Sequence, residues 1–135
     1  MSYRKIEKNI DNRGWLAEIL KAKDLKKKKF GQIFITVAKP GITKGGHYHK
    51  RKREFFCVIK GSAILTLQKI TPSEEIITTE KIEMGEDKLM VVEIEPYNLH
   101  YILNNGKEDM YLLVYTDEEF NPKDTDTYML KNEKK

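Results

Sequence analysis

Short segments rich in β-branched and aromatic residues recur along this chain, and turn-forming residues separate them at close intervals. Such spacing is typical of an all-β sandwich or barrel whose strands pair as antiparallel neighbours. The tripeptide Asn104-Asn105-Gly106 predicts a hairpin between the last two segments, because Asn and Gly accept the positive φ angles of tight turns. We expect strands at residues 32–37, 54–59, 63–67, 75–79, 88–94, 99–103 and 110–116.

The length of 135 residues fits a single domain, which we expect over residues 1–130, followed by a disordered lysine-rich tail at 131–135. The longest apolar runs are far shorter than the roughly 20 residues that cross a bilayer, so we expect no membrane span. Cys57 is the only cysteine, which excludes an intramolecular disulfide and favours a cytoplasmic location. Because this thiol lies in an apolar run, we expect it in the core rather than as a nucleophile.

Charge is distributed unevenly along the sequence. Residues 1–60 hold 17 lysine and arginine residues against 5 acidic ones, whereas residues 61–135 hold 8 against 16. The sequence has no helix-turn-helix, zinc-finger spacing or RNP-like aromatic strand, so we expect no nucleic acid partner. We interpret the basic half as a field for a small anion.

Three histidines occur in the chain, and two of them, His47 and His49, are separated by one residue. On a strand, residues i and i+2 project from the same face, so both imidazoles can reach one ion. Glu54 follows across a polar stretch long enough to turn its carboxylate back to that face, and His100 is a fourth candidate. Three imidazoles and a carboxylate suit Zn, Fe, Mn, Ni or Co. The alternative is a half-solvated histidine pair without a metal.

Gly41, His47, His49, Glu54 and Gly61 stand at a fixed spacing in the sequence. This spacing matches the first signature of the cupin superfamily, and the residues around His100 resemble the second. The second signature is represented by His100 and Asn104, although Tyr97 stands where glycine is usual. The resemblance implies an antiparallel jelly-roll barrel in which the three histidines and Glu54 bind the metal.

A closer resemblance is to the C-terminal cupin domain of bacterial capsular-polysaccharide assembling enzymes. It covers about residues 11–130 and rests on the runs 39–49, 90–96, 104–109, 120–122 and 126–128. In those enzymes a reductase is fused to a zinc-binding cupin that epimerises C3 of a UDP-linked 4-keto-6-deoxy amino sugar. The resemblance therefore implies a sugar-nucleotide epimerase of surface polysaccharide synthesis, a divalent metal with zinc favoured, and a separate reductase as a partner.

The stretch 11–18 resembles the Arg-Gly-x-x-x-Glu segment of dTDP-4-keto-6-deoxyglucose 3,5-epimerases. That segment is extended and contacts the nucleotide, so we expect extended structure at 15–25, where the apolar spacing alone would also fit a helix. The resemblance implies nucleotide contacts from Arg13 and Glu18. An ordinary strand with a surface ion pair is the alternative.

In those epimerases a histidine that aligns with His47 is the base and no metal is needed, whereas the further ligand-type residues of this chain favour a metal. If all four side chains bind the ion, another residue must move the proton. The candidates for that role are Lys44, Tyr97, Tyr101, Tyr111 and Tyr115. Of these we assign Lys44 and Tyr101, together with His47, to catalysis.

By strand parity, Gln32, Phe34 and Thr36 share one face, and its two polar members suit a cavity that binds a sugar. We assign these three residues to the substrate wall. For the basic cluster 50–53 two interpretations stay open, a site for the diphosphate of a nucleotide sugar and a solvated hairpin tip.

Alternatives to the epimerase also stay open. They are a sugar-nucleotide 3,4-ketoisomerase, another metal-dependent cupin enzyme of small metabolites, and a non-catalytic sugar-binding cupin. The sequence does not distinguish a UDP-linked from a dTDP-linked substrate. We expect a homodimer, because related cupins pair through their sheets and a chain of this size gains buried area in that way.

Overall fold

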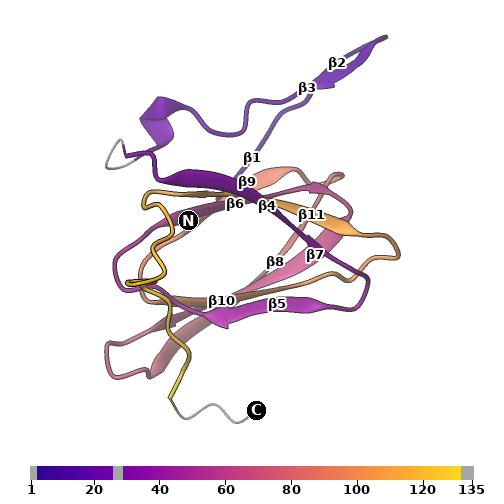
Figure 1. Cartoon of the computed structure of the whole chain (residues 1–135). Helices are drawn as coiled ribbons and strands as arrows, with labels where there is room; N and C mark the ends of the chain where they lie inside the picture. Colours follow the sequence, from indigo (N-terminus) through magenta and orange to yellow (C-terminus); the bar gives the residue numbers. More distant parts are fainter. Residues whose placement is uncertain (1–2, 26–28, 132–135) are drawn as a thin grey trace.

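The computed structural model describes residues 3–25 and 29–131, and its main body is a pair of antiparallel sheets packed face to face (Figure 1). The five-stranded sheet has the order β1-β9-β6-β11-β4, and the four-stranded sheet has the order β5-β10-β7-β8. The predicted all-β jelly-roll architecture is confirmed. Residues 132–135 of the predicted tail lie outside the described residues.

All seven predicted segments coincide with strands of these sheets or overlap them. The five-stranded sheet contains β1 (Tyr3–Lys5), β4 (Gln32–Ala38), β6 (Glu54–Lys60), β9 (Met90–Ile94) and β11 (Met110–Thr116). The four-stranded sheet contains β5 (Thr43–His47), β7 (Ser62–Ile70), β8 (Ile76–Gly85) and β10 (Asn98–Leu103). A separate hairpin and one 3-10 turn precede β4, namely β2 (Asn9–Asp11), β3 (Gly14–Leu16) and η1 (Ala22–Asp24). No helix in the described part of the chain has the length and hydropathy to cross a membrane.

Apolar side chains fill the space between the sheets, because inward-facing positions alternate along each strand. Val58, Leu65 and Met110 are fully buried there. A second apolar cluster includes Cys57, and residues of the segment before β4, such as Leu20, pack against it. Burial raises the pKa of the Cys57 thiol to about 11. This cysteine is therefore a core residue, as expected.

The turn after β10 differs from the prediction. The hairpin expected at Asn104–Gly106 is wrong, because β10 pairs with β5 and β7 whereas β11 pairs with β4 and β6. The turn crosses between the two sheets instead. Asn104 is fully buried; its amide donates to the carbonyls of Ala38 (2.9 Å) and Glu108 (2.8 Å), and its side-chain oxygen accepts the Gly106 N–H (2.9 Å). These hydrogen bonds satisfy the buried amide and fix the turn that crosses between the sheets.

The hairpin β2–β3 projects away from the two sheets (Figure 1). Its extended strand β3 agrees with the structure expected for the segment 15–25, but residues 22–24 form a 3-10 turn. The apolar side chains of Ile10 and Leu16 are exposed. An isolated two-stranded hairpin is at best marginally stable in water, so contacts with another molecule would stabilise it.

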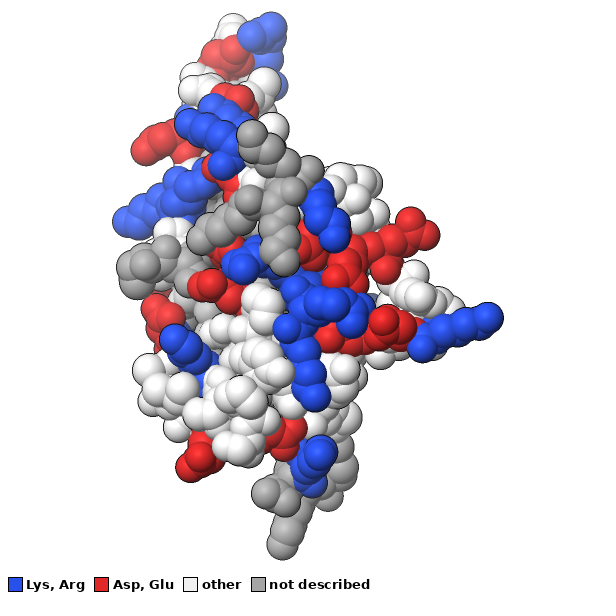
Figure 2. Space-filling model, turned by 90° about the vertical axis from the view of Figure 1, so that its left-hand side faces the viewer, with Lys and Arg blue, Asp and Glu red and all other residues white. Residues whose placement is uncertain are grey.

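On folding, ion pairs link the basic half of the sequence to the acidic half. Arg51 of the basic half pairs with Glu118 (2.9 Å) and Asp124 (3.2 Å), and Arg53 pairs with Glu93 (2.6 Å). On the face drawn in Figure 2, basic and acidic side chains are interspersed. The expected anion field of the basic half is therefore not present on this face.

Candidate active site

The three histidines meet at one end of the space between the sheets. His47 is the last residue of β5, and its Cα partner in the neighbouring strand β10 is His100. His49 follows two residues later, after Tyr48 has formed a bridge to Tyr128. One nitrogen from each ring lies within 4.8 Å of the others. The fold therefore brings together the three imidazoles that the sequence proposed as a cluster.

Glu54 begins strand β6 beside two of these rings. Its Oε1 atom lies 3.0 Å from Nε2 of His49 and 3.4 Å from Nε2 of His100. Burial alone would raise the pKa of this carboxyl, but the neighbouring rings of His100 and His49 lower it below its ordinary value. Glu54 is therefore an anion that faces the histidine cluster.

The hydrogen bonds of His100 leave one ring nitrogen without a partner. Its Nδ1 atom donates to the carbonyl of Asn98 (2.9 Å), so in the neutral ring this nitrogen carries the proton and Nε2 carries the lone pair. Nε2 is buried and has no hydrogen bond to the described residues, since the contact with Glu54 is too long for a normal one. A buried nitrogen lone pair beside a carboxylate fits a divalent cation.

His49 fits the same interpretation. Its Nδ1 atom lies 2.8 Å from the carbonyl of Asp126, and its Nε2 atom faces Glu54. Both neighbouring groups are acceptors, and a neutral imidazole has only one N–H to donate. A cation between Nε2 and the carboxylate would satisfy the second nitrogen.

His47 is kept neutral by its surroundings. Burial and the neighbouring rings of His100 and His49 lower its pKa to about 4. A neutral imidazole can offer a lone pair at neutral pH, so this residue can act as a ligand or as a base. The four residues His47, His49, Glu54 and His100 thus form a donor set that suits zinc.

A cavity of about 370 Å³ opens next to the cluster. The cavity is lined by His47 and by four other residues that we assigned to catalysis or to the substrate wall. These four are Phe34, Thr36, Lys44 and Tyr101. Lys44 donates through Nζ to Oγ1 of Thr36 (2.7 Å), so the two polar side chains are held against each other. The rest of the lining comes from Gly45, Glu54, Phe56, His100, Ile102, Leu112 and Val114.

Three of the proposed substrate residues do not line this cavity. Gln32 accepts the backbone N–H of Phe120 through its side-chain oxygen (2.9 Å) and is not among the residues that line the cavity. Arg13 forms an ion pair with Asp11 (2.6 Å) inside the hairpin β2–β3. Glu18 lies 3.6 Å from the ammonium group of Lys21. For Arg13 and Glu18 this arrangement matches the surface ion pairs that the sequence left open.

The remaining tyrosines are outside the cavity. Tyr97 stacks on the ring of Tyr48, with 5.9 Å between the ring centroids. Tyr115 donates its hydroxyl to the carbonyl of Lys29 and belongs to the second apolar cluster. Tyr111 is also absent from the cavity lining. Of the five candidates for the proton-transfer role, only Lys44 and Tyr101 reach the cavity.

Tyr97 adopts the backbone conformation that glycine would have at this position. Its φ angle is 61°, in the left-handed region that non-glycine residues seldom occupy. The Tyr97 N–H donates to the carbonyl of His49 (2.7 Å), and its carbonyl accepts the N–H of Ile70 (2.9 Å). The departure from the cupin signature therefore leaves the loop before His100 able to join the site.

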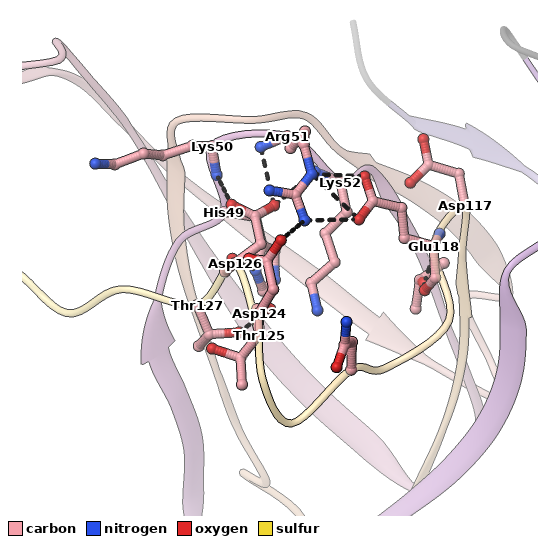
Figure 3. A network of polar contacts seen from close by, with 12 residues as sticks. His49, Lys50, Arg51, Lys52, Asp117, Glu118, Asp124, Thr125, Asp126 and Thr127 are labelled. Carbon is pink, nitrogen blue, oxygen red and sulfur yellow. Dashed lines mark hydrogen bonds and ion pairs between the residues drawn. The ribbon is translucent and has the colours of Figure 1, made fainter.

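The side chains of the basic cluster 50–53 have partners or are buried, and Lys50 and Arg51 remain exposed, as the interpretation of a solvated tip expects. Arg51 and Arg53 have carboxylate partners, and the Lys50 ammonium lies 4.3 Å from the centre of the Tyr128 ring. Lys52 is buried. The carboxylate of Asp126 binds the backbone of this loop (Figure 3), a contact that the sequence analysis missed because nothing in the spacing links residues so far apart.

Two facing antiparallel sheets with a three-histidine cluster and a glutamate beside a cavity define the cupin class. Within that class, this chain belongs to the polysaccharide biosynthesis C-terminal domain family, whose sequence profile matches residues 9–128.

Relatives of known name agree with this assignment. UDP-2-acetamido-2,6-beta-L-arabino-hexul-4-ose reductase of Pseudomonas aeruginosa is 39% identical over 87% of this chain and 29% of its own length. Spore coat polysaccharide biosynthesis protein SpsL of Bacillus subtilis is 26% identical over 91% of this chain and 82% of its own length.

Solved structures show the same likeness. Capsular polysaccharide assembling protein CapF of Staphylococcus aureus matches 93% of this chain and 34% of its own, with 33% identity and a TM-score of 0.69. A dTDP sugar isomerase of Desulfovibrio desulfuricans has a TM-score of 0.83 at 15% identity over 94% of this chain and 81% of its own, which shows a shared fold. The chain spans about a third of the length of the reductase and of CapF.

Proposed function

We propose that this chain is a sugar-nucleotide epimerase that moves a proton beside the ketone of a nucleoside-diphosphate 4-keto-6-deoxy sugar. Its product would enter surface polysaccharide synthesis. The observation that carries the proposal is the convergence of His47, His49, His100 and Glu54 with Lys44 and Tyr101 at one cavity. The reaction needs a group that polarises a ketone and groups that move a proton, and this cavity contains candidates for both.

The three histidines and Glu54 would hold a divalent ion, with zinc favoured by the donor set. Such an ion, when bound, supplies a Lewis acid for the ketone oxygen. The ion would add to the rate, because a positioned base alone contributes only about 10² to 10⁴, whereas enzymes accelerate reactions by roughly 10⁶ or more. The side chains left to move protons are then Lys44 and Tyr101.

Lys44 and Tyr101 suit a proton exchange for a structural reason. They stand on the neighbouring strands β5 and β10 and line the same cavity. Epimerisation removes a proton from carbon and returns one to the opposite face, which two separate groups can accomplish. Phe34 and Thr36 would form the wall that holds the sugar. If no ion is bound, His47 is the candidate base, because its low pKa keeps it neutral.

A UDP-linked substrate has the stronger support. The relative with 39% identity carries a UDP-linked 2-acetamido-hexul-4-ose in its name, whereas the neighbours named for dTDP sugars share only 12–22% identity. The reductase name also supports a reductase as a functional partner of this chain. We therefore select a UDP-linked 2-acetamido-4-keto-6-deoxy sugar as the first substrate to test.

A homodimer forms part of the proposal. Strand β4 is an edge strand of the five-stranded sheet, and it carries the exposed apolar residues Ile33, Ile35 and Val37 on the face opposite the cavity wall. Natural proteins seldom leave an apolar edge strand uncovered, because such edges aggregate. A second copy would cover this surface and shelter the hairpin β2–β3.

Incubation of the zinc-loaded protein with the UDP-linked keto sugar in D₂O, followed by proton NMR, tests the function. We expect the C3 proton signal to disappear as deuterium replaces it. A sample treated with chelator and a Glu54→Gln variant serve as controls, and both should exchange slowly.

Each of the other results would be recognisable: exchange at C5 would keep the epimerase class and change only the carbon, and the rest would contradict the proposal. Exchange at C5 alone would place the chemistry at a different carbon. A ketone that migrates to C3 would indicate a ketoisomerase, and substrate-dependent consumption of O₂ would indicate an oxygenase. Binding without any exchange would indicate a non-catalytic sugar-binding cupin.

A further inference from the structure

Asp126 lies in the segment after β11, next to the loop that joins His49 to Glu54 (Figure 3). It is only 3% exposed, although it comes from a segment without regular secondary structure. Its carboxylate accepts the backbone N–H groups of Lys50 (3.0 Å), Arg51 (2.9 Å) and Lys52 (2.8 Å). One side chain thus holds three consecutive N–H groups of the loop between two proposed metal ligands.

The main chain of Asp126 also contacts the site. Its carbonyl oxygen accepts a hydrogen bond from Nδ1 of His49 at 2.8 Å. A carbonyl can only accept, so this contact places the proton on Nδ1 and directs Nε2 toward Glu54 and the cluster. Partners of this kind fix the tautomer and the orientation of histidines that bind metals.

The backbone of Asp126 is in an uncommon conformation. Its φ angle is 51°, in the left-handed region that non-glycine residues seldom adopt, although Asp and Asn adopt it more readily than most. Four hydrogen bonds to the stretch 49–52 accompany this conformation, three through the carboxylate and one through the carbonyl. The same residue therefore fixes both the loop and the ring of His49.

We propose that Asp126 is a positioning residue of the candidate metal centre: its carboxylate fixes the loop after His49, and its carbonyl sets the tautomer of that ring. The inference rests on the proposed function for the identity of the bound ion alone. Asp126 acts through His49 and needs no contact with substrate.

Three variants separate the parts of this arrangement. Asp126→Gly keeps the left-handed backbone available and removes only the carboxylate. Asp126→Asn also tolerates that backbone, but its amide offers one acceptor oxygen in place of two. Asp124→Asn is the matched control, because Asp124 lies in the same segment and contacts only the exposed Arg51 side chain among the groups of this loop.

Zinc affinity, measured by competition with a chromogenic chelator, is the first readout. We expect Asp126→Gly to bind zinc about 10–100-fold more weakly, as is usual when the partner of a metal-binding histidine is lost. Asp126→Asn should lose less, and Asp124→Asn should equal the wild type. The absorption spectrum of the cobalt-loaded protein should change in the same order.

Nitrogen NMR of the histidine rings in the metal-free protein is the second readout. We expect a proton on Nδ1 of His49 in the wild type. In Asp126→Gly we expect a mixture of tautomers, because without the three carboxylate hydrogen bonds the carbonyl of residue 126 is no longer held beside Nδ1. Wild-type zinc affinity and an unchanged His49 signal in a folded Asp126→Gly protein would overturn the inference. If Asp126→Gly does not fold, then wild-type values in Asp126→Asn would overturn it.

The two proposals can fail separately. If the wild type binds no metal, the metal centre is wrong, but the NMR comparison still decides the role of Asp126. If zinc binds and Asp126→Gly weakens it, the positioning role stands even when no deuterium enters the sugar.

Discussion

At the scale of single residues, hydrogen-bond partners determine what the histidine cluster can bind. His49 and His100 each use Nδ1 to donate to a backbone carbonyl, which leaves both Nε2 atoms facing the Glu54 carboxylate. The sequence predicted these residues through their spacing. It could not predict their tautomers, because the carbonyls of Asn98 and Asp126 belong to different segments of the chain.

Glu54→Gln tests the carboxylate directly. The amide keeps the size of the side chain but removes the charge, so we expect zinc affinity to fall by more than about 100-fold, beyond the usual effect of losing an outer partner. Competition with a chromogenic chelator measures the zinc affinity. Glu80→Gln, at an exposed position of β8, is the control and should bind zinc like the wild type. Equal affinity in both variants would remove Glu54 from the ligand set.

The low pKa of His47 predicts a pH dependence of the metal-free protein. The folded value is about 4 against an ordinary 6.5, so between these values the unfolded chain binds more protons than the folded chain. The part of the free energy of unfolding that depends on His47 is therefore fully present above about pH 6.5 and is lost as the pH falls toward 4. Urea unfolding of the chelated protein at several pH values should show this loss, and a shallower one in His47→Gln. The same slope in both proteins would contradict a neutral, buried His47.

At the scale of elements, the sequence predicted strands better than connections. Runs of β-branched and aromatic residues predicted β4, β6 and β11 closely, because such residues suit a half-buried pleated surface. The turn at Asn104–Gly106 was misassigned, since a local preference for a turn does not say which sheet the next strand joins. Strand β5 was not in the predicted set, because its glycines weaken the strand pattern.

Two neighbouring glycines of β5 allow a matched test of how this strand positions His47. Gly45 and Gly46 have φ angles of 100° and 89°, but a Cβ atom on Gly45 would lie 2.7 Å from the His100 carbonyl, whereas one on Gly46 would meet nothing within 4 Å. We expect Gly46→Ala to cost about 1 kcal/mol from backbone strain. Gly45→Ala should cost at least about 1 kcal/mol more and should weaken zinc binding. Urea unfolding measures both costs, and equal costs would show that β5 and β10 do not pack this closely.

At the scale of the whole molecule, folding brings together charges and apolar residues that are far apart in the sequence. Arg51 and Arg53 meet acidic partners 40 or more positions away, which pairs part of the basic half with the acidic half. The sequence alone could not indicate this, because net charge carries no information about pairing in space. The apolar outer face of β4 and the projecting hairpin are among the surfaces that stay exposed in one chain.

Ile35→Glu tests the proposed dimer. Ile35 is 54% exposed on the outer face of β4, and a charge there would oppose burial against a second copy. We expect light scattering to give a mass of two chains for the wild type and of one chain, 15.9 kDa, for the variant. Ile76→Glu, 50% exposed on β8, is the control and should remain dimeric. A monomeric wild type would contradict the proposed dimer, and a dimeric Ile35→Glu protein would place the contact elsewhere.

The central claim is that three histidines and one glutamate bind a single ion beside the cavity. Crystals of the zinc-loaded protein, measured on both sides of the zinc absorption edge, test it most directly. We expect one anomalous peak about 2.0–2.2 Å from a nitrogen of His47, His49 and His100 and from an oxygen of Glu54. No peak at this cluster, or a zinc ion bound at other residues, would contradict the claim.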